Sequence, residues 1–258
     1  MEFENVAANL RESFRVVAAH RSGGELQEMD GVSIASAGVT FQMFNAAFLS
    51  APVVSEGQMD LRVAQAAVHF AARSQRWSYW ICHGWLDART RRRLQTVLRK
   101  RNLFQAVELP GMLAEDVSPP VRPLPPLDVR RVCHGPVKDG FCAIGSTCFN
   151  VPLAWFCEVF DSQSVWSDFA AYVGYLDGEP VSTAATVIGG GVVGVYNVAT
   201  MPGRRCAGCG EAVMRHALEQ ARREHGLSRT ILQSTPQGYN LYQRMGYRTV
   251  TSVSVFCS

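Results

Sequence analysis

The chain has 258 residues, of which 47% are hydrophobic and 18% charged, a composition typical of a packed globular protein and not of a disordered one. Its 25 basic and 22 acidic residues leave a net charge of +3, too small an excess to indicate a protein that coats nucleic acid or anionic lipid. No apolar run reaches the roughly 20 residues that cross a bilayer. The acidic start, Met1-Glu-Phe-Glu-Asn5, does not resemble a secretion signal, and eight cysteines are too few for a disulfide scaffold. We therefore expect a cytoplasmic location and reduced thiols.

The clearest boundary in the chain is the segment 118–126, which holds five prolines in nine residues. Proline fixes φ and removes a backbone donor, so neither a helix nor an interior strand is expected there. We predict a semi-rigid linker of polyproline type between an N-terminal domain, residues 1–117, and a C-terminal domain, residues 127–258.

Alternating helices and strands are predicted for the N-terminal half, with helices at 6–19, 61–72 and 86–98 and strands at 39–49, 77–82 and 104–109. In the second helix, the apolar residues on one face are expected to be buried: Leu61, Ala64, Ala67, Val68 and Ala71. Asn102 follows the third helix, at a position that favours a residue tolerating positive φ.

A similar alternation is predicted after the linker, ending with a strand at 230–234, a helix at 241–245, a turn at Gly246 and a strand at 247–256. Both halves therefore end in the order strand, helix, Asn or Gly, strand. We interpret the chain as two degenerate copies of one α/β unit.

The most informative segment is a β-branched strand from Val192 to Pro202, followed by a glycine-containing turn and a helix over 212–223. Glycine lets the backbone approach a ligand, and the first amides of a helix have no internal partners. Together with the positive end of the helix dipole, these amides form an anion site. Arg204 and Arg205 flank the turn and can bind phosphate oxygens. The alternative is an ordinary strand-to-helix turn that uses glycine for its geometry.

Two familiar phosphate-binding motifs do not fit this turn. A P-loop requires a lysine and a hydroxyl residue after its second glycine, and neither is present. A dinucleotide-binding turn requires a small residue where Val213 stands and an acid at the end of the next strand, which reads Gln233-Ser234-Thr235.

The pattern Arg205-x-x-Gly208-x-Gly210, between a strand and a helix, resembles the pyrophosphate signature (Arg/Gln-x-x-Gly-x-Gly/Ala) of the GNAT superfamily of acyl-CoA-dependent N-acyltransferases. Downstream, Leu241-Tyr-Gln-Arg-Met-Gly-Tyr247 is similar to the last helix of that family, and the interval of one helix and one strand also agrees. Cys206-Ala207 stand where members often have Gly-Arg, and we expect Arg204 to replace the lost cation.

The resemblance covers about residues 127–258, whereas residues 1–115 resemble the family only in element order, as in tandem GNAT proteins whose first half is degenerate. It implies an α/β fold of two GNAT-like mixed-sheet halves, of which the C-terminal one carries the acyl-CoA signature. The N-terminal half has no Arg-x-x-Gly-x-Gly and is expected to bind no acyl-CoA.

The resemblance also implies an N-acetyltransferase that moves an acetyl group from acetyl-CoA to a primary amine by direct attack in a ternary complex, with no metal. Tyr242 matches the general acid of the family, and Asn197 is able to orient a water. Residues 192–201 contain no carboxylate, and the sequence does not place the other candidate bases near the site: Glu158, Asp161, Asp168 and His134.

Acetyl-CoA is expected to contact the end of the strand, the glycine turn and the last helix. The residues concerned are Val198, Ala199, Thr200, Arg204, Arg205, Cys206, Ala207, Gly208, Cys209, Gly210, Glu211, Thr235, Tyr239 and Tyr242.

Two alternatives of other classes stay open. In the first, the chain is a non-catalytic acyl-CoA-binding module. In the second, Cys206-x-x-Cys209 serves redox chemistry or supplies half a zinc site. No second Cys-x-x-Cys or His-x3-5-His pattern completes such a site, which favours small side chains fitting a phosphate loop. No nucleic-acid or membrane partner is expected, and the sequence identifies neither the amine acceptor nor the oligomeric state.

Overall fold

A computed structural model describes the whole chain, residues 1–258. Its strands are β1 (Glu25–Met29), β2 (Val32–Ser36), β3 (Asn45–Leu49), β4 (Ser78–Cys82), β5 (Phe104–Ala114), β6 (Asp128–Arg131), β7 (Ala170–Leu176), β8 (Glu179–Gly189), β9 (Val192–Thr200), β10 (Thr230–Gln233) and β11 (Arg248–Cys257). Its α-helices are α1 (Glu2–Ala19), α2 (Glu56–Ala71), α3 (Ala88–Arg99), α4 (Gly135–Phe149), α5 (Leu153–Val159), α6 (Cys209–His225) and α7 (Tyr239–Arg244).

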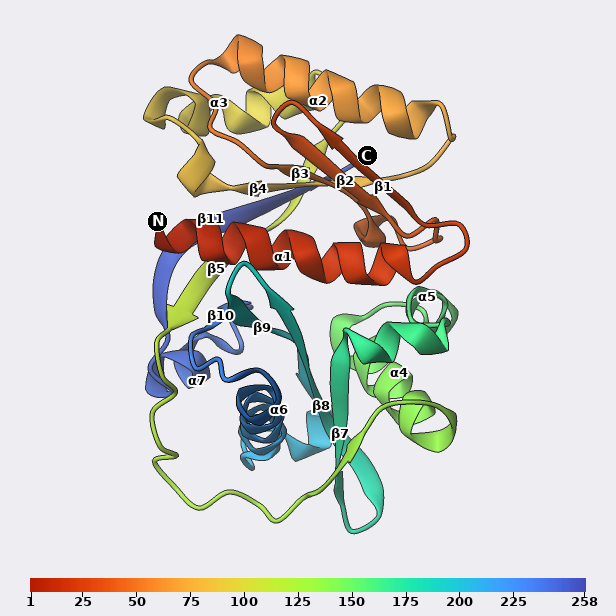
Figure 1. Cartoon of the computed structure of the whole chain (residues 1–258), viewed down its shortest axis with the longest axis vertical. Helices are drawn as coiled ribbons and strands as arrows, with labels where there is room; N and C mark the ends of the chain where they lie inside the picture. The colour runs from red at the N-terminus through yellow and green to blue at the C-terminus, as the bar shows by residue number, and fades with distance from the viewer.

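All eleven strands form one mixed sheet in the order β1-β2-β3-β4-β11-β5-β10-β9-β8-β7-β6 (Figure 1). Two pairs are parallel, β3 with β4 and β9 with β10, and each occupies the same place in its half of the chain. The expected α/β fold of two mixed-sheet halves is confirmed. None of the helices is long and apolar enough to span a membrane.

The two halves exchange their last strands. β11, at the C-terminal end of the chain, lies between β4 and β5 of the N-terminal half, and β5 lies between β11 and β10. The segment 118–126 forms neither helix nor strand, as its prolines predict. Neither half has a complete sheet of its own, because each takes a strand from the other. The division of the chain into two domains at this segment stays a prediction.

The turn before each exchanged strand has the backbone conformation that the sequence predicts. Asn102 has φ +57° between α3 and β5, and Gly246 has φ +96° between α7 and β11. A left-handed residue at the end of a helix reverses the chain so that it can return to the sheet. The repeated order strand, helix, Asn or Gly, strand therefore corresponds to one repeated structural unit.

The predicted buried face of the second helix is wrong. In α2 the side chains of Leu61 and Val68 are exposed, whereas Arg62 and His69 are buried. The Nη1 atom of Arg62 donates to the carbonyls of Ala51 (2.7 Å) and Pro52 (2.8 Å), which the preceding turn leaves unpaired. The apolar stripe that packs on the sheet begins two residues before the predicted one and consists of Met59, Val63, Ala66 and Phe70.

The predicted strand at 39–49 is correct only from Asn45. Residues Gln42–Phe44 form a 3-10 turn, and the buried side chain of Asn45 bonds both the amide and the carbonyl of Val39. This ring of hydrogen bonds folds the segment into a loop. The hairpin of β1 and β2 was not predicted, although its two-residue turn, Asp30-Gly31, is a common hairpin signal.

Helix α1 crosses the middle of the molecule, between the N-terminal layers and the C-terminal half (Figure 1). The side chain of Asn9 is fully buried, and its Nδ2 donates to the carbonyls of Val187, Gly189 and Val192 at 2.9–3.1 Å. Its Oδ1 accepts a hydrogen bond from the Tyr196 hydroxyl at 2.7 Å. One polar side chain thus ties the N-terminal helix to the β8–β9 hairpin.

We expect Asn9→Ala to lower the free energy of unfolding by about 2–4 kcal/mol, because it leaves several buried polar groups without partners. The control is Asn5→Ala, which removes one exposed bond to the carbonyl of Gly190 and should cost under about 1 kcal/mol. Urea unfolding followed by tryptophan fluorescence measures both. Equal losses of unfolding free energy in the two variants would show that the buried hydrogen bonds of Asn9 contribute no more than the exposed one of Asn5.

Candidate active site

The strands β9 and β10 separate soon after they meet. They pair at two positions, Val193 with Thr230 and Gly194 with Ile231. The β8–β9 register then shifts, and Asn197 takes φ +49°, which marks a bulge in β9. Past Gly194, β9 therefore has no strand partner on the β10 side, and its main chain lines an opening in the sheet.

A tight turn connects the end of β9 to α6. Cys206 and Gly208 both have left-handed backbones, with φ +62° and +89°, and α6 begins at Cys209. None of the main-chain amides from Cys206 to Glu211 donates a hydrogen bond to the protein. Consecutive free amides at the positive end of a 17-residue helix have the charge and the hydrogen-bonding character that suit an anion.

The charges around this turn favour an anion. Arg204 and Arg205 have no carboxylate within ion-pair distance, and the Nε of Arg205 donates to the carbonyl of Thr200 at 3.2 Å. The one acid in the first turn, Glu211, is paired with Arg215 at 2.8 Å. That pair neutralises the Glu211 carboxylate, so the Glu211 contribution to an anion is its amide.

The corresponding turn of the N-terminal half, residues 50–55, is built differently. The amide of Val53 donates to the carbonyl of Trp85 at 2.7 Å, and the amide of Val54 donates to Gln58 Oε1 at 3.0 Å. Arg62 Nη1 donates to two carbonyls of this turn, so these N–H groups are not free for a ligand. These contacts support the expectation that the N-terminal half binds no acyl-CoA.

Tyr242 lies on α7, on the same face of the sheet as α6. It belongs to a hydrophobic cluster that also contains Val213 of α6, with Val198 and Tyr239 at its margin. Its side chain is 8% exposed, and burial raises the pKa of the phenol to about 12. Side chains from the end of β9, from α6 and from α7 therefore belong to one hydrophobic cluster.

The other predicted site residues lie at the edges of this opening. The side chain of Asn197 makes no hydrogen bond within the protein, while its carbonyl accepts one from Thr183 Oγ1 at 2.7 Å. Thr235 lies between β10 and α7, and its carbonyl accepts the amides of Gly238 and Tyr239 at the start of that helix. Ala199 and Thr200 complete β9, with Thr200 Oγ1 directed toward Gly210.

Gln233 is a candidate that the sequence analysis did not single out. It is the last residue of β10, two positions beyond the final β9–β10 pair, and its Nε2 is buried without a hydrogen-bond partner. A buried amide without a partner costs free energy, which a ligand carbonyl at the opening would recover. The sequence showed only a strand end without a carboxylate.

The carboxylates considered as bases are engaged elsewhere. Glu158 accepts the amide of Thr40, Asp161 is paired with Lys138, and Asp168 is paired with His20. No general base is therefore assigned.

The cysteine pair of the turn does not have the character of a redox pair. Cys209 is buried, and burial raises the pKa of its thiol, so it holds its proton more firmly than a free cysteine. Cys206 is exposed. The structure has no group of three His, Cys, Asp or Glu side chains arranged to hold a metal ion.

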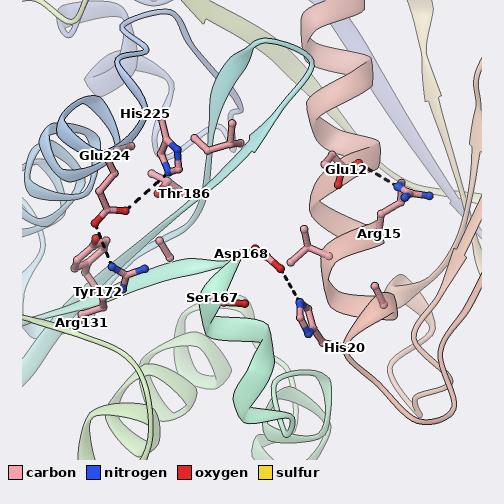
Figure 2. A pocket seen from close by; sticks show the side chains of 15 residues that line it. Glu12, Arg15, His20, Arg131, Ser167, Asp168, Tyr172, Thr186, Glu224 and His225 are labelled. Carbon is pink, nitrogen blue, oxygen red and sulfur yellow. Dashed lines mark hydrogen bonds and ion pairs between the residues drawn. The ribbon is translucent and has the colours of Figure 1, made fainter.

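A separate cavity of about 390 Å³ lies between α1, the start of β7 and the end of α6 (Figure 2). Basic and acidic side chains that line the cavity lie in pairs, including His20 with Asp168 at 2.8 Å and Arg131 with Glu224 at 3.2 Å. It is lined by the far end of α6, about 20 Å along the helix from the glycine turn. Of the residues considered for the site, only Asp168, one of the candidate bases, lines it.

Comparison with known proteins shows a partial family match and a shared fold. Residues 145–247 match the model of the acetyltransferase (GNAT) family. No curated protein sequence matches the chain significantly. The matched range contains the glycine turn, Tyr242 and the two strands that separate. Residues 145–247 are thus similar to the acetyltransferase (GNAT) family, and the chain as a whole has the fold of a tandem GNAT protein.

Solved structures support the tandem arrangement over nearly the full length. A GCN5-related N-acetyltransferase from Kribbella flavida is 19% identical, with a TM-score of 0.71, 98% of this chain and 95% of that chain covered. One from Sphaerobacter thermophilus is 12% identical, with a TM-score of 0.56 and coverage of 88% and 80%. A tandem GNAT protein from the clavulanic acid biosynthesis pathway is 10% identical, with a TM-score of 0.56 and coverage of 94% and 87%.

Proposed function

We propose that the chain is an N-acetyltransferase that moves an acetyl group from acetyl-CoA to a primary amine by direct attack in a ternary complex. The observation that carries this proposal is the run of free amides from Cys206 to Glu211, at the start of α6 and beside the opening between β9 and β10. A diphosphate matches these amides in charge and in hydrogen-bonding character.

In this proposal the pantetheine arm follows the free edge of β9 into the opening. Amides near Val198 polarise the thioester carbonyl and stabilise the oxyanion that forms when the amine attacks. One donor of this kind contributes on the order of 2.7–4 kcal/mol in other enzymes. The carbon–sulfur bond then breaks, and Tyr242 donates a hydrogen bond to the departing sulfur.

Asn197 is assigned to orienting the amine or a water beside it, because its side chain has no partner in the protein. No carboxylate is assigned to deprotonate the amine, which would therefore enter in its neutral form or lose its proton to water. The partners in this proposal are acetyl-CoA and an amine, and the reaction needs no metal.

The proposal is tested by measuring thiol release from acetyl-CoA across a panel of amines, including polyamines, amino acids, aminoglycosides and peptides. Thiol release that depends on both substrates, with the acetylated amine detected by mass spectrometry, supports it. If CoA binds but no amine increases thiol release above hydrolysis, the chain is a non-catalytic acyl-CoA-binding module. If CoA does not bind, the chain is neither an acetyl-CoA-dependent transferase nor an acyl-CoA-binding module.

A further inference from the structure

The proline-rich linker runs directly against the glycine turn. In Figure 1 it leaves β5, curves below α6 in this view and returns to the sheet beside β7. Arg122 Nη2 donates to the carbonyl of Cys206 at 2.9 Å. A Cβ atom built on Gly208 would lie 3.1 Å from Pro125 Cδ and 3.5 Å from Leu124 Cδ2. The absence of a side chain at Gly208 therefore lets the linker lie against the turn.

Arg122 brings a further positive charge to a turn that lacks one of its usual cations. Cys206 and Ala207 occupy the positions where the resemblance leads us to expect an arginine. The Arg122 guanidinium is exposed and has no carboxylate partner, and its single hydrogen bond in the protein goes to the turn itself. Most of its N–H groups therefore stay available.

The linker also restricts where this guanidinium can go. Prolines at 123, 125 and 126 fix the backbone φ of the residues that follow Arg122. The contact of Pro125 with Gly208 holds that stretch against the turn. Arg205 is held in a similar way, by one bond from its Nε to the carbonyl of Thr200. The two guanidiniums are thus each anchored to a main-chain carbonyl beside the free amides.

We propose that Arg122 is a phosphate ligand of the acyl-CoA site, supplied by the linker between the halves in addition to Arg204 and Arg205 of the turn. This inference rests on the proposed function, since it assumes that the turn binds the phosphates of CoA. It gives the linker a binding role in addition to its role as a connector.

The test compares ligand affinity by titration calorimetry for the full-length wild type, Arg122→Ala, Arg122→Lys and Arg222→Ala. Arg222 is an exposed arginine without an ion pair near the end of α6 opposite the glycine turn, so its variant loses the same charge at a distance from the turn. CoA, dephospho-CoA and pantetheine serve as ligands, because they carry three, two and no phosphates. Circular dichroism confirms that each variant is folded.

We expect Arg122→Ala to raise the Kd of CoA about tenfold, Arg122→Lys to recover part of that loss, and Arg222→Ala to change it less than twofold. The Kd of pantetheine should be unchanged in every variant. If Arg122→Ala loses the same affinity for CoA and for dephospho-CoA, Arg122 binds the diphosphate. If it loses affinity for CoA alone, Arg122 binds the 3′-phosphate.

Three results would overturn the inference. One is an Arg122→Ala affinity for CoA within twofold of wild type, although wild type binds CoA. Another is a weaker affinity for pantetheine, which would show that Arg122 acts through the fold. A tighter affinity of Arg122→Ala for CoA would show that the side chain obstructs the site. If the wild-type protein binds no CoA, the proposed function itself is wrong, and this result differs from the three above.

Discussion

Replacement of Tyr242 by phenylalanine is expected to lower kcat for acetyl transfer by about 10²-fold, at the lower end of the range for general acid catalysis, with little change in the KM for acetyl-CoA. The phenol holds its proton more tightly than the departing thiol, because burial raises the Tyr242 pKa to about 12 while a free thiol has a pKa of about 8.5. The hydroxyl should therefore stabilise the developing thiolate by a hydrogen bond, while the attacking amine provides the proton that finally leaves with the thiol.

The pH dependence follows from the direction of that pKa shift. Because the folded pKa lies above the usual value for tyrosine, the phenol stays protonated from neutral pH up to about pH 11. No loss of kcat from Tyr242 ionisation is expected below that pH, and any rise of rate between pH 7 and 9 belongs to the amine.

Tyr172→Phe is the matched control for Tyr242→Phe. Tyr172 is a buried tyrosine in the same hydrophobic cluster, on β7, and its hydroxyl makes no hydrogen bond in the protein. Steady-state kinetics of the two variants should separate them by about two orders of magnitude in kcat, within the range for general acid catalysis. Similar rates for both would remove the hydrogen-bonding role assigned to Tyr242 at the departing sulfur.

A fragment of residues 127–258, produced alone, is expected to show no cooperative unfolding transition and no CoA binding. The fragment contains the whole family-matched range, but it lacks both strands that flank β11, namely β4 and β5. It also lacks the β5 edge that pairs with β10, together with Met112 and Ala114 of the core around Tyr242. The loss exposes apolar surface and unpaired strand edges, which favours aggregation.

Co-production of residues 1–126 with residues 127–258 provides the control. The cut falls in the linker, outside every helix and strand, so the two fragments can still form the complete sheet. We expect them to co-purify and to regain a thermal transition, as followed by calorimetry. A fragment 127–258 that folds and binds CoA alone would show that the strand exchange is dispensable.

The sequence predicted the elements around the opening because local signals specify them. β-branched residues mark β9, two glycines and two arginines mark the turn, and the helix that follows has a regular apolar face. Tyr242 and Gly246 are separated by one helical turn, which is a short-range pattern of the same kind. Each of these features depends on residues that are neighbours along the chain.

The features that the sequence did not predict depend on residues far apart in the chain. Nothing in β11 indicates that it pairs with β4, about 170 positions earlier, because its apolar alternation fits either half. The contact between Arg122 and Cys206 spans 84 residues and involves a segment without regular structure. The exposed face of α2 was misassigned because apolar residues occur on both of its sides, and a buried arginine decided its orientation.

The most direct test of the account is a crystal structure of the full chain with CoA. We predict that the diphosphate contacts the amides between Cys206 and Glu211, that the pantetheine arm lies between β9 and β10, and that the sulfur ends near the Tyr242 hydroxyl. CoA bound in the N-terminal half, or in the cavity between α1 and the end of α6, would contradict the account.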